Sequence, residues 1–286
     1  MTDLEEIQER FRMTDGFNLF YRCWRASGEI DRVVVCIHGI PGDSRGFKAI
    51  GPSLAADGNQ VYALDLRGIA NSKEENLPKG DVRDLKRNLQ DLDEVVSEVR
   101  RNHPRKKVYM LGYSLGGVYT LWHAANRPDS LDGLVLAAPA IVVPAMSTRK
   151  ASFLLFFANI FVPKMMYNLV QEPELVKAIL QDHIGSTKVS IRYLASAKRT
   201  LVEKALENAS RIDKPTLILQ GEADDAALPI GAKRLYESLR TKQKTIQTFP
   251  DADHGFLSYY ATFSAKYDLA KREHAFSVVK DWLRTH

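Results

Sequence analysis

Cysteines, long apolar runs and net charge are all scarce in this sequence, and each shortage excludes a class of protein. The 286 residues include only two cysteines, Cys23 and Cys36, which cannot build a disulfide framework and fit no zinc-ligand spacing. No run reaches the roughly 18 consecutive apolar residues of a transmembrane helix. The acidic N-terminal sequence, MTDLEEIQER, lacks the basic and then apolar order of a secretory signal. These absences predict a cytoplasmic protein.

The composition is otherwise that of an ordinary globular protein. Hydrophobic residues make up 45% and charged residues 26% of the chain, so the chain can bury a full core and disorder is excluded. The net charge is +5, and most of the excess lies in residues 144–210. Such a segment is compatible with an anionic lipid surface, an acidic ligand or a plain solvated face. No zinc-finger, RNP-type or basic-zipper motif is present, so nucleic acid is not an expected partner.

Apolar runs that alternate with amphipathic stretches predict an α/β protein. Runs rich in β-branched residues predict strands at Phe17–Trp24, Arg32–His38, Gln60–Asp65, Val108–Gly112, Leu134–Ala138, Thr216–Gln220 and Thr245–Phe249. Helical patterns separate them. In one of these, Asp81 is the expected N-cap and apolar residues recur every three or four positions from Leu85 to Val99. This order predicts a mostly parallel central sheet flanked by helices.

The alternation stops after the sequence LVLAAPA and returns at KPTLILQG, and only helical patterning lies between. We therefore predict an α/β core formed by residues 1–143 and 209–286. Residues 144–208 are the expected insertion, a helical cap (lid) over the carboxyl edge of the sheet. Open α/β sheets bind their ligands at that edge.

A G-x-S-x-G sequence, Gly112–Gly116, lies between a predicted strand and a predicted helix. This is the context of a nucleophile elbow, in which the serine has a strained backbone and small neighbours avoid clashes across the turn. Ser114 is therefore the expected nucleophile. An ordinary helix N-cap is the alternative interpretation.

A serine hydroxyl is a poor nucleophile until a base removes its proton. Among seven histidines, His254 directly follows the last predicted strand, in FPDADHGF, where a loop can carry it to the elbow. The acid that orients the imidazole is expected between Ser114 and His254 in the chain. Glu222, Asp224 and Asp225 follow a strong predicted strand there and are the candidates.

Acyl transfer also needs backbone N–H groups that stabilise the oxyanion. One comes from the residue after the nucleophile, here Leu115. Ile40 is the candidate for the second, because it follows a buried strand in the sequence HGIPG. A plain strand-ending turn is the alternative for that segment. We interpret His38 as a structural residue that orients the loop.

Together these motifs resemble the α/β-hydrolase superfamily and, within it, the monoacylglycerol lipase and lysophospholipase-like serine hydrolases. The matching segments are HGIPG, VYALDLRG, GYSLGG, LVLAAPA, PTLILQGEAD and PDADHGF, in the family's order across nearly the whole core. The resemblance implies Ser114 as nucleophile, His254 as base and Asp224 as acid. It also implies Ile40 and Leu115 as oxyanion donors. No metal or organic cofactor is implied.

Two spacings disagree about the acid. The family spacing G-x-x-D, counted from Gly221, selects Asp224, whereas D-x-x-x-P, counted back from Pro229, selects Asp225. We prefer Asp224 because the strand fixes where the loop leaves the sheet. The proline end can absorb an extra residue, since proline is favourable at a first helical position whatever precedes it.

The chain departs from the family in the turn after VYALDLRG. Where the family commonly reads DLRGHGxS, this chain has Ile69 and Ala70 in place of the His-Gly pair. The departure lies outside the expected triad and affects the conformation of the loop.

The cap contains an apolar run, Phe153–Val162, that is too short to span a bilayer. It can pack as ordinary core, line an acyl-chain tunnel or touch a membrane surface. Under the tunnel interpretation, the substrate-binding residues are Phe153, Phe156, Phe157, Met165, Met166 and, beyond the base, Tyr259. Packing beneath the cap is the alternative for Tyr259.

The resemblance thus predicts a serine carboxylic-ester hydrolase that forms an acyl-enzyme and acts on lipid-like esters, in the first place monoacylglycerols. We expect transient membrane contact only through the cap. Within enzymes, the alternatives are a lysophospholipase, a small-ester carboxylesterase and a peptidase that removes an N-terminal residue. A catalytically silent hydrolase fold used as a binding module is the non-enzymatic alternative.

Overall fold

The computed structural model describes residues 5–40, 42–144, 189–259 and 268–286. Its strands are β1 Glu6–Arg12, β2 Asn18–Trp24, β3 Arg32–Ile37, β4 Asn59–Leu64, β5 Lys107–Tyr113, β6 Gly133–Ala137, β7 Thr216–Gly221 and β8 Lys244–Phe249. Its helices are α1 Ile50–Ala55, α2 Leu85–Asn102, α3 Leu115–Asn126, α7 Ile191–Ala197, α8 Ala205–Ala209, α9 Pro229–Ser238 and α10 Leu269–Thr285. Short turns of other helix types are η1 Ser44–Phe47, η2 Ala70–Ser72 and the π-helical η3 Lys198–Val202.

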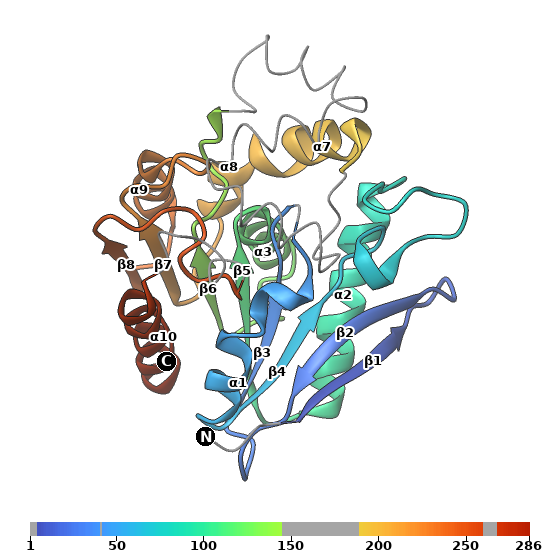
Figure 1. Cartoon of the computed structure of the whole chain (residues 1–286), viewed down its shortest axis with the longest axis horizontal. Helices are drawn as coiled ribbons and strands as arrows, with labels where there is room; N and C mark the ends of the chain where they lie inside the picture. Colours follow the sequence, from blue (N-terminus) through green and yellow to red (C-terminus); the bar gives the residue numbers. More distant parts are fainter. Residues whose placement is uncertain (1–4, 41, 145–188, 260–267) are drawn as a thin grey trace.

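One eight-stranded sheet organises these elements, in the order β1-β2-β4-β3-β5-β6-β7-β8 (Figure 1). β2 pairs antiparallel with β1 and β4, and every pair from β4 to β8 is parallel. The predicted mostly parallel sheet with flanking helices is therefore confirmed. Every predicted strand is present.

β1 was not predicted, because its sequence, EIQERFR, has little apolar patterning. Only Phe11 in this strand is fully buried. β1 pairs with β2 alone, at the edge of the sheet, and an edge strand buries less surface than a central one. Its hydrophobic signal is correspondingly weak.

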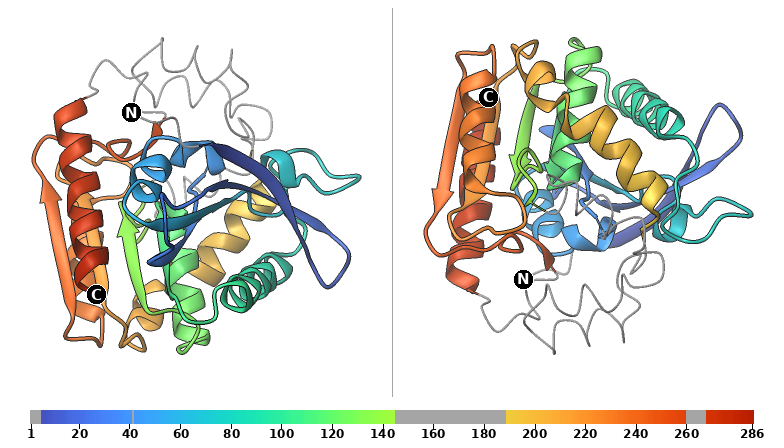
Figure 2. Two further views of the ribbon diagram at one scale, coloured as in Figure 1. Left: turned by 90° about the horizontal axis from the view of Figure 1, so that it is seen from below. Right: turned by 90° about the horizontal axis from the view of Figure 1, so that it is seen from above.

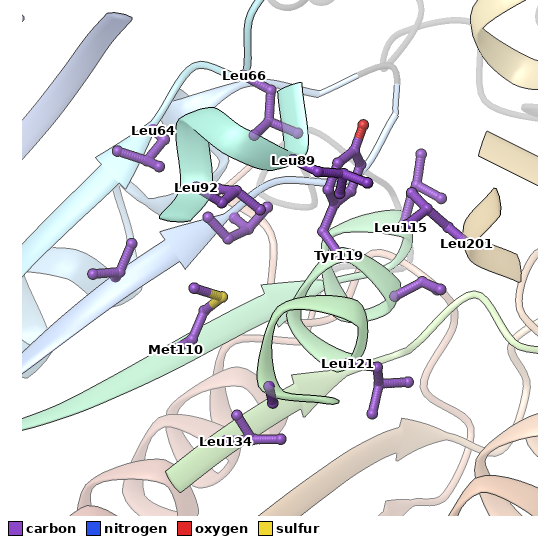
Figure 3. Packing of buried hydrophobic residues seen from close by; sticks show 14 of the residues in the cluster. Leu64, Leu66, Leu89, Leu92, Met110, Leu115, Tyr119, Leu121, Leu134 and Leu201 are labelled. Atoms are coloured by element: carbon purple, nitrogen blue, oxygen red, sulfur yellow. The ribbon is translucent and has the colours of Figure 1, made fainter. Parts of the chain in front are cut away.

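The inner strands are buried on both faces, which explains why they read as continuous apolar runs. Along β3, Val33, Val35 and Ile37 join a cluster with α2 and α3, whereas Val34 and Cys36 join a second cluster with α1 and α10. Figure 3 shows members of the first cluster, namely Leu64, Leu66, Leu89, Leu92, Met110, Leu115, Tyr119, Leu121, Leu134 and Leu201. The two clusters hold the sheet as the middle layer of three.

The expected N-cap of α2 was wrong by one turn. The helix begins at Leu85, and the carboxylate of Asp84 accepts a hydrogen bond from the N–H of Lys86 at 2.9 Å. The carboxylate of Asp81 instead pairs with Arg192, which lies in α7, in the described end of the insertion. The predicted apolar face from Leu85 to Val99 is buried as expected.

The described end of the insertion packs beside the sheet. α7, η3 and α8 lie against α2 and α3 (Figure 2), and Tyr193, Leu201 and Ala205 belong to the first apolar cluster. The remainder of the predicted cap lies outside the described residues. Of the helices that the structure describes, none has the length and apolar character needed to cross a bilayer.

Candidate active site

Ser114 lies on the sharp turn that joins β5 to α3, with a backbone φ of +54°. This conformation is strained for a residue other than glycine. Three hydrogen bonds hold it: the Ser114 N–H donates to the carbonyl of Ala137 at 2.9 Å, and its carbonyl accepts from Gly117 at 3.0 Å and Ala140 at 3.1 Å. The bonds to Ala137, at the end of β6, and from Ala140, just after it, therefore hold the turn on one side.

The two glycines of the motif are required by close backbone approaches. A methyl group at Gly112 would come within 2.4 Å of the Gly116 carbonyl oxygen. A methyl group at Gly116 would come within 2.0 Å of the Ile37 carbonyl oxygen. Both distances are far below van der Waals contact, so the predicted reason for these glycines is borne out in the geometry.

The structure brings Ser114, His254 and Asp224 into one hydrogen-bonded chain. His254 Nε2 lies 3.0 Å from Ser114 Oγ, and His254 Nδ1 lies 2.8 Å from Asp224 Oδ2. Ser114 is 8% exposed and Asp224 2% exposed, while the His254 side chain is partly exposed. The arrangement places an imidazole between a hydroxyl and a buried carboxylate, each within hydrogen-bonding distance of one ring nitrogen.

The Asp224 carboxylate is held by several donors besides His254. Its Oδ1 accepts from the N–H groups of Ala226 at 2.9 Å and Ala227 at 2.7 Å, and its Oδ2 accepts from Gln220 Nε2 at 3.1 Å. Asp225, the other aspartate of the loop, is exposed. Gln220 was not predicted, because its place at the end of β7 gives no sign of which side it faces.

The loop after β3 lies directly against Ser114. A methyl group at Gly39 would come within 2.7 Å of Ser114 Cβ and 3.3 Å of Ser114 Oγ, so only glycine fits there. The peptide that joins Gly39 to Ile40 therefore lies beside the Ser114 side chain. Leu115 opens α3, where amide N–H groups have no acceptor within the helix. Both expected oxyanion donors are thus next to Ser114.

His38 fixes the direction of the Gly39–Ile40 peptide. Its Nε2 accepts from the Leu66 N–H at 3.1 Å, which places the ring proton on Nδ1, and Nδ1 lies 2.7 Å from the Gly39 carbonyl oxygen. The carbonyl and N–H of a trans peptide point in opposite directions. Holding the Gly39 carbonyl therefore also directs the Ile40 N–H, in keeping with the structural interpretation of His38.

The turn that departs from the family pattern is well packed. Ile69 is buried, and Ala70 has φ of +43°, a left-handed conformation that glycine adopts more easily. The carboxylate of Asp65 accepts hydrogen bonds from the N–H groups of Asn71 and Ser44, so it joins this turn to the loop after β3.

Cys36 is fully buried, and this burial raises the pKa of its thiol, as expected for an inert residue.

The predicted substrate-binding residues of the cap lie outside the described residues: these are Phe153, Phe156, Phe157, Met165 and Met166. Tyr259 is described and is partly buried in the segment that follows His254. The structure therefore leaves the acyl-binding role of all six as a prediction.

A mostly parallel sheet, with a serine on a strained turn after an inner strand and a histidine and a carboxylate on loops after later strands, defines an α/β hydrolase. The chain belongs to the family described as serine aminopeptidase, S33, whose model matches residues 28–258. It is therefore a serine hydrolase, as the motifs predicted.

Several relatives are named as lipases. The monoglyceride lipase of Rattus norvegicus is 26% identical over 248 residues, which cover 84% of this chain and 80% of the relative. The monoacylglycerol lipase of Mycolicibacterium smegmatis is 24% identical over 263 residues, covering 89% and 92%. The crystal structure of the Paleococcus ferrophilus monoacylglycerol lipase superimposes with a TM-score of 0.74 at 25% identity, covering 94% and 99%. The resemblance to this branch is confirmed.

Proposed function

We propose that this chain is a serine carboxylic-ester hydrolase that acts on lipid-like esters, with monoacylglycerols as the first candidates. The observation that carries the proposal is the Asp224–His254–Ser114 chain of hydrogen bonds, built at a strained elbow with two backbone donors beside it. Ester hydrolysis through an acyl-enzyme uses this set of groups: a nucleophile, a base, an orienting acid and an oxyanion site.

In the proposed acylation step, Ser114 Oγ attacks the ester carbonyl carbon while His254 Nε2 takes the hydroxyl proton. The carbonyl oxygen becomes an oxyanion and accepts hydrogen bonds from the N–H groups of Ile40 and Leu115. Collapse of the tetrahedral intermediate breaks the bond to the alcohol. The departing alkoxide receives the proton from His254, which leaves an acyl group on Ser114.

Deacylation repeats the sequence with water. His254 takes one water proton, the hydroxide attacks the acyl carbonyl, and Ser114 leaves with that proton restored. Asp224 remains ionised throughout and stabilises the imidazolium that forms in each half-reaction. The four donors on its carboxylate keep the charge in place, because a buried carboxylate is stable only when it is well hydrogen-bonded.

The relatives support an ester substrate over a peptide. Monoglyceride lipases match more than four-fifths of this chain, whereas the proline iminopeptidase of Clostridioides difficile matches 46% of it. The family description, serine aminopeptidase, keeps release of an N-terminal residue as the second candidate. Both reactions use the same attack on a carbonyl, so the leaving group distinguishes them.

We also propose the division into a core, residues 1–143 and 209–286, and a cap, residues 144–208, that receives the acyl chain. Transient contact of this cap with a lipid surface belongs to the same proposal, since a monoacylglycerol has to be drawn out of an interface. The apolar composition of Phe153–Val162 supports both ideas.

A panel of substrates tests the proposed function. The purified chain is assayed against monoacylglycerols from butyryl to oleoyl, p-nitrophenyl acetate, lysophosphatidylcholine and an aminoacyl-naphthylamide, with Ser114→Ala as the background. We expect the monoacylglycerols to be preferred, with kcat/KM rising by at most about fourfold for each buried methylene, or about 0.8 kcal/mol.

Two results would contradict the proposal. Hydrolysis of the aminoacyl-naphthylamide in the absence of esterase activity would identify a peptidase. A strict preference for the acetyl ester, without any gain for longer chains, would exclude the lipid substrate while leaving an esterase.

A further inference from the structure

Tyr113, the second residue of the G-x-S-x-G motif, has a contact that the proposed reaction does not use. Its hydroxyl donates a hydrogen bond to the backbone carbonyl of His254. Its ring centroid lies 5.4 Å from that of the His254 imidazole, with the two planes inclined by 35°. The residue before the nucleophile is thus bonded to the backbone of the proposed base.

The neighbours of His254 make other hydrogen bonds in the loop that carries it: the Gly255 N–H donates to the Asp253 carboxylate at 2.9 Å, across His254. Ala252 is held at the end of β7, because its carbonyl accepts from the N–H of Ala223 at 3.0 Å. His254 follows two residues later and lies in no helix or strand. Besides the bonds of the imidazole to Asp224 and Ser114, the bond from Tyr113 reaches the backbone of His254 itself and ties it to β5.

Tyr113 is itself a rigid anchor. It is the last residue of β5, it pairs in register with Ala137 of β6, and its side chain packs against the second apolar cluster. Burial, and after it the negative charges of Asp224 and Asp253, raise the pKa of Tyr113 well above its usual value. The hydroxyl therefore keeps its proton and remains a donor near neutral pH.

We propose that Tyr113 is a positioning residue for the base: its hydroxyl holds the His254 backbone so that Nε2 stays within reach of Ser114 Oγ. The inference rests on the proposed function. Tyr113 and Ser114 are adjacent in the chain. The bond from Tyr113 to His254 therefore fixes the position of the base relative to the backbone that carries the nucleophile. A small displacement of a catalytic group lowers the rate steeply, so the bond acts on kcat and leaves substrate binding unchanged.

The chain offers a matched control on the same strand. Tyr109 lies four residues earlier in β5, about 13 Å away along the strand, and faces the same apolar cluster. Its hydroxyl is buried and has no hydrogen-bond partner among the described residues. Tyr109→Phe and Tyr113→Phe therefore remove the same atom from the same face, and only the second change affects the His254 loop.

The experiment compares both variants with the parent chain in three measurements: kcat and KM for a p-nitrophenyl ester, the rate of labelling by a fluorophosphonate, and hydrogen exchange of the amides in residues 252–258. We expect Tyr113→Phe to lower kcat and the labelling rate by about tenfold, with KM changed by less than about twofold. Exchange in the loop should become faster. Tyr109→Phe should match the parent in all three. Phenylalanine fills the same space, and melting temperatures establish that both variants are folded.

Two outcomes would overturn the inference. If Tyr113→Phe retains the kcat of Tyr109→Phe, the hydroxyl has a structural role only. If KM rises while kcat is unchanged, Tyr113 contacts the substrate instead of positioning the base. Ser114→Ala is measured in the same series and tests the proposed function separately. Normal labelling of that variant would show that Ser114 is not the nucleophile.

Discussion

At the scale of single residues, the described part of the chain brings together a second group of aspartate, histidine and serine besides Ser114, His254 and Asp224, and its geometry differs. His123 Nε2 lies 2.8 Å from Ser130 Oγ, and His123 Nδ1 lies 3.0 Å from Asp93 Oδ1, but neither of the last two atoms has a hydrogen-bond partner among the described residues. However, the Ser130 hydroxyl donates to the carbonyl of Arg127, and Ser130 lies in the turn before β6 without a strained elbow. An aspartate, a histidine and a serine close together are therefore not sufficient to identify a candidate active site. The conformation of Ser114 and the backbone donors beside it make the difference.

The choice of acid gives a prediction at the same scale. Asp224→Asn should lower kcat by up to about 10⁴-fold while the fold is retained, because the imidazole loses the partner that fixes its tautomer. Asp225→Asn should lower kcat far less, since that side chain is exposed. Steady-state kinetics on the two variants, with far-UV circular dichroism as a folding control, decide the matter. A strongly reduced kcat in Asp225→Asn, together with a nearly normal kcat in Asp224→Asn, would show that Asp225 is the acid.

The turn before His254 offers a stabilising substitution. Pro250 and Asp251 occupy its central positions, the N–H of Ala252 donates to the carbonyl of Phe249 at 3.3 Å, and Asp251 has φ of +55°. A proline followed by a left-handed residue is the pattern of a type II turn, which favours glycine in the second place. Asp251→Gly should raise the free energy of unfolding by about 0.5–1 kcal/mol.

Urea denaturation measures this change, and the esterase assay serves as its control. Because Asp251 is exposed and contacts no proposed catalytic group, kcat should remain that of the parent chain. A lower free energy of unfolding in the variant would mean that the aspartate stabilises the turn through its side chain.

At the scale of elements, a buried ion pair joins the turn after β4 to α2. Arg67 donates to Asp91 twice, from Nε at 2.6 Å and from Nη2 at 2.9 Å, and both side chains are almost fully buried. The guanidinium also lies 4.0 Å from the ring centroid of Phe17. The pair therefore ties α2 to the turn after β4.

Breaking this pair should be strongly destabilising. Arg67→Met should lower the free energy of unfolding by about 3 kcal/mol, because the buried Asp91 carboxylate loses its bidentate partner and keeps only Arg87, which donates to Oδ1 and leaves Oδ2 without that donor. Arg240→Met is the matched control: Arg240 and Asp213 are 2.8 Å apart but 63% and 51% exposed, so its loss should amount to less than about 1 kcal/mol. Equal losses in urea denaturation would show that burial of the Arg67 pair does not set its strength.

Elements with a strong apolar pattern in their own sequence were predictable from it. Elements that depend on contacts with neighbouring segments were not. The runs that form β3, β5 and β7 are apolar on both faces, so their sequences reveal them. β1 was missed because pairing with β2, and not its own composition, makes it a strand. The N-cap of α2 was misplaced because Asp81 and Asp84 are equally good caps, and the path of the preceding turn decides between them.

At the scale of the whole molecule, the order of the parallel strands assembles the site. Ile40 follows β3, Ser114 follows β5, Asp224 follows β7 and His254 follows β8, and parallel strands bring their carboxyl ends to one edge of the sheet. This explains why motif positions sufficed to select these residues. The contacts of Tyr113 and Gln220 could not be predicted, because they depend on side-chain directions that are set only when neighbouring strands and loops are packed.

The central claim is that Ser114 is the nucleophile of a serine hydrolase, and labelling by a fluorophosphonate probe tests it most directly. The parent chain, Ser114→Ala and Ser130→Ala are treated with the probe, and the modified residue is located by mass spectrometry. We predict that the parent chain and Ser130→Ala are labelled at residue 114 at the same rate, and that Ser114→Ala is not labelled. Labelling of Ser114→Ala, or its loss in Ser130→Ala, would contradict the account.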